Sequence, residues 1–88
     1  MEKKRQRLYD VIRHAYDYPE NRENVALSQL LLAASNRLIK HSNPLLVAYQ
    51  LNQDVDNYLL DNDILLPKSL YRFKQSLEKY ILEEASSV

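Results

Sequence analysis

Asp10 and His14 are the residues of this chain whose types and spacing come closest to a catalytic or metal-binding pair. Four positions apart on a helix, they would lie on one face, where a carboxylate can orient an imidazole as a base or share a metal ion with it. Such a site needs a further ligand or nucleophile, and the sequence places none beside this pair. We therefore interpret the pair as a solvated ion pair and predict a protein that is not an enzyme, with no catalytic, cofactor-binding or metal-binding residues.

The segment Asp61-Asn62-Asp63 has the acidic character of a calcium-binding loop. A loop of that kind also needs a glycine at its sharp turn and a glutamate at its twelfth position, and both are missing. We predict instead that this segment ends a helix, with Asn62 in the left-handed conformation that glycine usually adopts. His41 is expected in the last turn of an earlier helix, where the negative end of the helix dipole favours an imidazolium.

Composition excludes several classes of protein. The chain has 88 residues, with no glycine, cysteine or tryptophan, and with 12 basic and 12 acidic side chains. Phosphate-binding loops and tight hairpins need glycine, and disulfide frameworks and thiolate metal sites need cysteine. A net charge near zero argues against nucleic acid as a partner. The length and composition predict one soluble domain over residues 1–88. The sequence shows no pattern of a signal peptide or a membrane span, so we expect a cytoplasmic location.

Three prolines mark the expected starts of helices. Pro19, Pro44 and Pro67 are each followed by good helix formers, and Asn43 before Pro44 is a good capping residue. The predicted helices cover about residues 3–17, 21–41, 44–61 and 67–85. Because the links between them are short, we expect an all-α fold, an antiparallel four-helix bundle.

Apolar residues at helical spacing predict the face that each helix buries. The expected core residues are Leu8, Val11, Ile12 and Ala15; Leu27, Leu30, Leu31, Ala34 and Leu38; Ala48, Leu51, Val55, Tyr58 and Leu59; and Leu70, Phe73, Leu77, Tyr80 and Ile81. Val25, Leu32 and Ile39 form a second stripe on the opposite side of the helix at 21–41. Either this helix is buried on two sides, or the second stripe binds a partner protein.

The basic segment at residues 1–7 suggests two partners, the anionic inner leaflet of a membrane or a nucleic acid. It could also be only the solvated start of a helix. It contains no aromatic residues on which bases could stack, which argues further against nucleic acid.

Residues 27–81 resemble the bacteriocin immunity proteins of lactic acid bacteria and streptococci, in particular the enterocin A immunity type. The resemblance depends on a leucine-rich helix that ends at Asn43-Pro44, and on Leu66-Pro67 at the start of the last helix. That last helix then carries Leu70, Phe73 and Leu77. Many members of the family have a longer C-terminal tail, which helps to decide the bacteriocin they counter.

This resemblance implies a cytoplasmic bundle that protects its cell from a pediocin-like (class IIa) pore-forming peptide. The implied partner is the sugar-transporter receptor of the mannose phosphotransferase system, bound at its cytoplasmic side once the peptide has engaged it; the immunity protein is expected to be a monomer. Asn43, Pro44, Leu66 and Pro67 would then have structural roles as helix starts. Recognition is attributed in the family to the C-terminal half, here the loop at residues 61–66 and the exposed side of the last helix. Helical phase selects the candidate partner-binding residues Lys68, Tyr71, Arg72, Gln75, Lys79 and Leu82.

Two hypotheses from other classes stand beside the immunity role. A small helical adaptor or regulatory protein that binds a partner helix would use the stripe of Val25, Leu32 and Ile39. An enzyme would depend on Asp10 and His14 alone.

Overall fold

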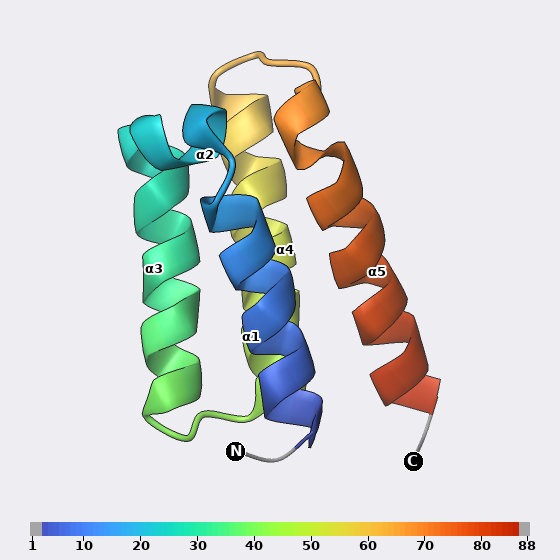
Figure 1. The fold of residues 1–88 in the computed structure, drawn as a ribbon. Coiled ribbons are helices and arrows are strands. Elements are labelled where there is room, and N and C mark those ends of the chain that lie inside the picture. Colours follow the sequence, from blue (N-terminus) through green and yellow to red (C-terminus); the bar gives the residue numbers. More distant parts are fainter. Residues whose placement is uncertain (1–2, 87–88) are drawn as a thin grey trace.

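The computed structural model describes residues 3–86, which are helical and contain no strand (Figure 1). Its elements are α1 (Lys3–Tyr16), α2 (Pro19–Glu23), α3 (Val25–Ile39), α4 (Pro44–Asp61), the 3₁₀ helix η1 (Lys68–Leu70) and α5 (Tyr71–Ser86). The long helices lie side by side: α3 packs on α1 and α4, and α5 packs on α4 and α1. The predicted all-α class is confirmed, but residues 3–86 contain five α-helices rather than the four expected. The first two residues of the basic segment lie outside the described range.

The helix expected over residues 21–41 is interrupted at Asn24. This residue has extended backbone angles (φ −83°, ψ 110°), so α2 ends before it and α3 begins after it. Its Oδ1 accepts a hydrogen bond from the Leu27 backbone N–H at 3.1 Å, which caps α3, and its Nδ2 donates to the Tyr58 hydroxyl at 2.8 Å. A cap of this kind stabilises a helix start by about 1 kcal/mol. Asn24 thus replaces the expected continuous helix with two helices.

The helix predicted over residues 44–61 is confirmed as α4. Asn43 caps it, because its Oδ1 accepts from the Leu45 N–H at 2.9 Å and the Leu46 N–H at 3.3 Å. Pro44 occupies the first turn, where a missing N–H costs nothing.

The last helix does not begin at Pro67 as expected. Pro67 has extended backbone angles (φ −72°, ψ 153°), Leu66 precedes it in the connection, and η1 follows. The Leu70 N–H donates to the Pro67 carbonyl at 2.9 Å, an i to i+3 bond that gives the tighter 3₁₀ turn. The regular helix α5 therefore starts at Tyr71, and it extends to Ser86.

At the end of α3, His41 takes the left-handed conformation, with φ 69°. The His41 N–H donates to the Leu38 carbonyl at 3.1 Å, and the Ser42 N–H donates to the Arg37 carbonyl at 3.0 Å. These two bonds form a Schellman motif, which satisfies carbonyls that the helix leaves without partners. We expected His41 within the last turn of the helix, but it follows that turn.

The end of α4 repeats this arrangement with Asp63, whose φ is 51°. The Asp63 N–H donates to the Leu60 carbonyl at 3.1 Å, and the Ile64 N–H donates to the Leu59 carbonyl at 2.9 Å. The expectation that Asn62 would be left-handed is wrong by one position: its φ is −101°. The chain has no glycine, and a histidine and an aspartate supply the two left-handed residues found within residues 3–86.

The buried apolar side chains form one cluster, to which every helix except α2 contributes. They are Leu8, Ile12, Ala15, Leu27, Leu31, Ala34, Leu38, Val47, Ala48, Leu51, Val55, Leu70, Phe73, Leu77 and Tyr80. This confirms the predicted stripes and adds Val47, which was not predicted. The remaining predicted core residues pack against the cluster while partly buried: Val11, Leu30, Tyr58, Leu59 and Ile81.

Two polar residues are buried in the part of the chain that the structure describes, and both join helices. Asn21 is fully buried, and its Nδ2 donates to the carbonyls of Ala15 (2.9 Å) and Ser69 (3.0 Å), which ties α2 to the end of α1 and to η1. Lys74 on α5 donates to Asn52 and, at 2.7 Å, to Asp56 on α4. Buried polar groups need partners of this kind, because leaving one without any costs about 1–3 kcal/mol.

Candidate functional site

The six residues selected as a candidate partner-binding surface are all exposed on η1 and α5. Tyr71 and Leu82 are 50% and 69% exposed, high values for large apolar side chains. With Gln75, they lie at helical spacing on the side of α5 opposite its buried face. Lys79 lies beside this line, and its Nζ is 3.9 Å from Glu83 Oε1. These side chains are placed where a partner can reach them; their role in binding stays a prediction.

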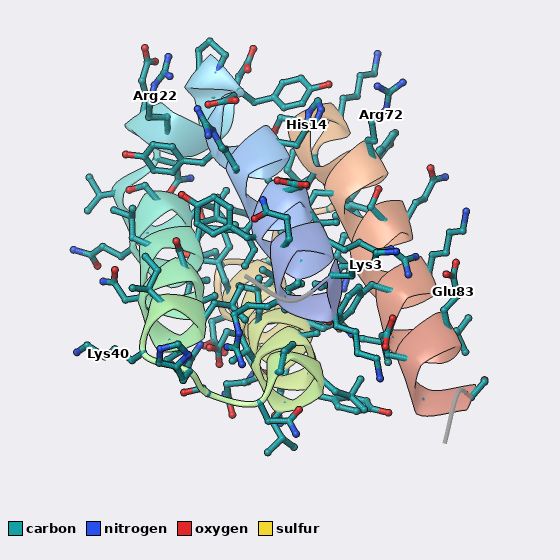
Figure 2. The ribbon with its side chains drawn as sticks, turned by 60° about the horizontal axis from the view of Figure 1, so that its bottom comes forward. Lys3, His14, Arg22, Lys40, Arg72 and Glu83 are labelled. Atoms are coloured by element: carbon teal, nitrogen blue, oxygen red, sulfur yellow. The ribbon has the colours of Figure 1, made fainter. Side chains whose placement is uncertain are left out.

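Arg72 differs from the other five because it lies toward α1. It lines a cleft of about 330 Å³ between α1 and α5. Phe73 from α5 and Val11 and Ala15 from α1 give the cleft apolar walls, and His14 lines it as well. Figure 2 shows His14 and Arg72 at the same end of the two helices. The structure thus places Asp10 and His14 of α1 around the same cleft as Arg72, one member of the surface predicted on α5.

Asp10 and His14 do not form the ion pair expected from their spacing. Both are exposed and line the same cleft, but Asp10 Oδ1 accepts a hydrogen bond from Gln6 Nε2 at 2.9 Å, and no ion pair joins it to His14 in the described range. Gln6 lies one helical turn before Asp10, and His14 lies one turn after it. The two side chains can therefore compete for the Asp10 carboxylate, and Gln6 holds it. No group of three or more potential metal ligands gathers anywhere in residues 3–86.

The first turns of α1 use their positive charge within the molecule. Lys4 Nζ is 3.4 Å from Glu84 Oε2, and Arg7 Nη2 is 2.7 Å from Glu83 Oε2. The Arg7 guanidinium also lies over the Tyr80 ring, 5.4 Å from its centre, a cation–π contact. These contacts attach α1 to the last turns of α5.

Arg5 makes a different attachment, to the end of α3. Its Nη1 donates to the Leu38 carbonyl at 2.9 Å and to the Ser42 carbonyl at 2.8 Å. A guanidinium at a helix C-terminus satisfies orphan carbonyls and interacts favourably with the helix dipole. Much of the charge that could have attracted an anionic leaflet therefore has a structural use. None of the helices in residues 3–86 combines the length and apolarity needed to cross a bilayer.

The second stripe of α3 lies on its outer surface. Val25, Leu32 and Ile39 are 69%, 47% and 55% exposed, so the interpretation that α3 is buried on two sides is wrong. The reason is the packing: α1 and α4 cover one side of α3, and the opposite side faces outward. Leu32 also borders a groove between α1 and α3. The interpretation of this stripe as a partner-binding surface stays open.

The connection between α4 and η1 carries the most exposed aliphatic residue of the described chain. Leu65 is 91% exposed, Ile64 in the same connection is 43% exposed, and Leu60 near the end of α4 is 77% exposed. Leu60 was not predicted as a surface residue, although its place next to the last residue of α4 and outside the core stripe is a signal for exposure. Together with Asp61 and Asp63, these residues give the end of the molecule an apolar and acidic character.

Comparison with known proteins identifies the family. The model of the bacteriocin immunity protein family matches residues 3–82, from the start of α1 through most of α5. No curated protein and no solved structure matches the chain. The resemblance first noted over residues 27–81 is therefore confirmed, and the match adds α1, where sequence inspection found no family feature beyond amphipathicity. The chain belongs to the bacteriocin immunity protein family.

Proposed function

We propose that this protein protects its cell from a pore-forming bacteriocin of the pediocin-like class. It acts in the cytoplasm as a monomer, by binding the mannose phosphotransferase receptor from its cytoplasmic side once the peptide has engaged that receptor. Membership of the bacteriocin immunity protein family carries this proposal. The receptor and the peptide class come from the resemblance to the enterocin A immunity type.

The fold proposed for this role is a single domain, an antiparallel four-helix bundle of α1, α3, α4 and α5, with α2 and η1 as short connecting helices. A rigid bundle of this kind can block a receptor in one of its states if it binds that state more tightly than the others. The free energy of such binding is usually concentrated in a few apolar or aromatic anchors surrounded by polar residues.

The outer face of α5 offers this combination. Tyr71 and Leu82 are the exposed apolar anchors, and Gln75, Lys68 and Lys79 are polar neighbours. The exposed aliphatic residues of the connection between α4 and η1 lie at the end of α5 where Tyr71 stands, so the two surfaces can form one continuous contact with a partner.

The decisive experiment is a protection assay in a strain sensitive to pediocin-like peptides. Expression of the wild-type chain should raise the inhibitory concentration of at least one peptide from a panel, relative to an empty vector. The triple variant Tyr71→Ala, Gln75→Ala, Leu82→Ala should lose this protection. A matched triple variant on the outer face of α4, Leu46→Ala, Gln50→Ala, Gln53→Ala, changes residues that are also exposed and should protect as well as wild type.

A receptor test complements the cell assay. Purified protein should retain detergent-solubilised mannose phosphotransferase receptor in the presence of the matching peptide and not in its absence. Absence of protection against every pediocin-like peptide would overturn the proposed function. Full protection by the α5 triple variant would move the recognition surface elsewhere and leave the immunity role intact.

The exposure of Val25, Leu32 and Ile39 favours a second candidate, a helical adaptor that binds a partner helix along α3. A three-residue apolar stripe at this spacing matches the way one helix packs along another. Leu32→Glu should abolish such binding and leave the thermal unfolding transition unchanged, because the side chain is outside the core. If Leu32→Glu retains both its stability and its protection, the α3 stripe has no part in immunity.

A further inference from the structure

The cleft between α1 and α5 is shaped for one bulky side chain. Its volume of about 330 Å³ is at the small end of the range for ligand pockets. Val11 and Ala15 on α1 and Phe73 on α5 supply its apolar walls, and Tyr18 lines it as well. A burial site of this size suits an aromatic or large aliphatic anchor better than an extended ligand.

Some of the charged side chains that line this cleft have partners within the protein, and others have none in residues 3–86. Arg7 is engaged by Glu83 at 2.7 Å, and Asp10 accepts from Gln6. His14 and Arg72 are both exposed, and neither has a carboxylate within ion-pair distance in residues 3–86. They come from different helices and stand at the same end of the cleft (Figure 2). The apolar walls therefore end at two cationic or polar donors that lack an acceptor.

We infer that this cleft binds an acidic segment of a protein partner, with one bulky apolar side chain inserted between α1 and α5 and a neighbouring carboxylate held by Arg72 and His14. Arginine can hold a carboxylate through two parallel hydrogen bonds, which adds direction to the attraction of the charges. The inference rests on the proposed function, which supplies the need for a protein partner, and it gives the Arg72 edge of the recognition surface a specific chemistry.

Asp10 helps to distinguish a peptide from a lipid. A peptide backbone brings N–H donors from which the Asp10 carboxylate can accept, whereas a fatty acid brings no donor for it. Ser76 also lines the cleft and can donate to a peptide carbonyl. The mixture of donors and acceptors around an apolar cavity therefore favours a peptide segment.

The groove on the other side of α1 provides the matched comparison. It has a similar volume of about 310 Å³ and lies between α1 and α3, but its charged residues are Arg13 and Asp17, one of each sign. Arg13→Glu thus makes the same change of charge as Arg72→Glu, on the other helix of the pair, without altering the α1–α5 cleft. Arg13 is also exposed, so its replacement leaves the core intact.

The test is a titration of the ¹⁵N-labelled full chain with a pentapeptide that has phenylalanine between two pairs of glutamates. Amide signals of cleft residues on α1 and α5 should shift in a saturable manner. Arg72→Glu should weaken the affinity at least tenfold, whereas Arg13→Glu should change it less than twofold. Ser76→Phe, which fills the cleft without changing its charge, should weaken binding as strongly as Arg72→Glu. Thermal unfolding followed by circular dichroism identifies any variant that loses its fold.

Several results would overturn the inference. The first is a set of signal shifts confined to residues outside the cleft. The second is equal affinity for a peptide with lysines in place of the glutamates, or with alanine in place of phenylalanine. The third is tighter binding of decanoate than of the acidic peptide at the cleft. The cell assay separates this inference from the proposed function. Peptide binding in the cleft with no protection against any bacteriocin counts against the immunity role alone, and full protection by Arg72→Glu and by Ser76→Phe counts against the cleft alone.

Discussion

The two ends of the α1–α5 pair carry similar positive charges and use them differently. Where α1 begins and α5 ends, Lys4 and Arg7 lie 2.7–3.5 Å from the carboxylates of Glu83 and Glu84. We call this the paired end. Where α1 ends and α5 begins, near α2, His14 and Arg72 have no such partner within residues 3–86. We call this the α2 end.

The comparison shows that basic residues on a small bundle are not equivalent. At the paired end, cations hold helices together, and the Tyr80 hydroxyl donates to the Lys4 carbonyl in the same region. At the α2 end, the helices are joined instead by the buried amide of Asn21, which leaves the nearby cations available to a partner. A net charge near zero therefore conceals one end whose cations form ion pairs within the molecule and one end, within residues 3–86, where His14 and Arg72 form none.

The largest expected effect is at the α2 end. Asn21→Ala removes the donor to the Ala15 and Ser69 carbonyls inside a buried site and should lower the free energy of unfolding by about 2 kcal/mol. Urea unfolding followed by circular dichroism measures this value. The matched variant Asn57→Ala lies on the exposed surface of α4 and should change it by less than about 0.5 kcal/mol. Equal effects of the two substitutions would show that Asn21 does not join the helices at this end.

At the paired end, Tyr80→Phe should lower the free energy of unfolding by about 1 kcal/mol, because the ring stays buried and only the hydroxyl is lost. The same substitution at Tyr71, which is half exposed, should have almost no effect on stability. Urea unfolding again provides the measurement. A loss at Tyr80 no greater than that at Tyr71 would contradict the role given to this hydrogen bond.

The two left-handed residues allow a change that stabilises each end. The end of α3, which His41 follows, lies toward the paired end, and the end of α4, which Asp63 follows, lies toward the α2 end (Figure 1). Glycine adopts the backbone conformation of both residues without the steric cost of a Cβ atom. His41→Gly and Asp63→Gly should each raise the free energy of unfolding by about 0.5–1 kcal/mol, seen as a higher melting temperature. Lys40→Gly is the control and should lower it, because Lys40 has φ −84°. No increase at either site would mean that the side chains contribute contacts that offset the strain.

The smallest effect concerns the ion pair of Arg7 with Glu83. Their side chains are 41% and 44% exposed, so water screens the pair and the coupling energy from a double-mutant cycle of Arg7→Gln and Glu83→Gln should be about 0.5 kcal/mol or less. The coupling should decrease further in 1 M salt. Arg72→Gln at the α2 end should leave stability unchanged at any salt concentration. A salt-dependent loss of stability in Arg72→Gln would reveal that its charge has a structural partner, and the contrast between the two ends would fail.

Much of the fold could be predicted because its determinants are local. The start of α4 follows from Asn43 and Pro44 alone, and the buried faces follow from the spacing of apolar residues. The break at Asn24 could not be predicted in this way, since asparagine is tolerated within helices. Its capping role is supported by a hydrogen bond to Tyr58, which is 34 positions away in the chain.

The candidate site was predictable only as far as helical phase allows. Phase correctly indicated that the selected residues of α5 are exposed, but it could not show that Arg72 borders a cleft with residues of α1. The separation of Asp10 from His14 depends on competition from Gln6, and the exposure of Leu32 depends on which sides of α3 its neighbours cover. These outcomes are properties of the assembled helices, so a single helix cannot reveal them.

The hydrogen bond between Tyr80 and Lys4 joins residues 76 positions apart, and this separation affects the order of events during synthesis. A ribosome adding 5–20 residues per second needs roughly 4–18 s for 88 residues, and α5 emerges after the other helices described here. Until then, α3 and α4 can pack against each other, but the cations of Lys4 and Arg7 have no acidic partners on α5. The nascent chain thus passes through an interval in which the cations of α1 are not yet paired with α5 and the helix is less anchored than in the folded protein.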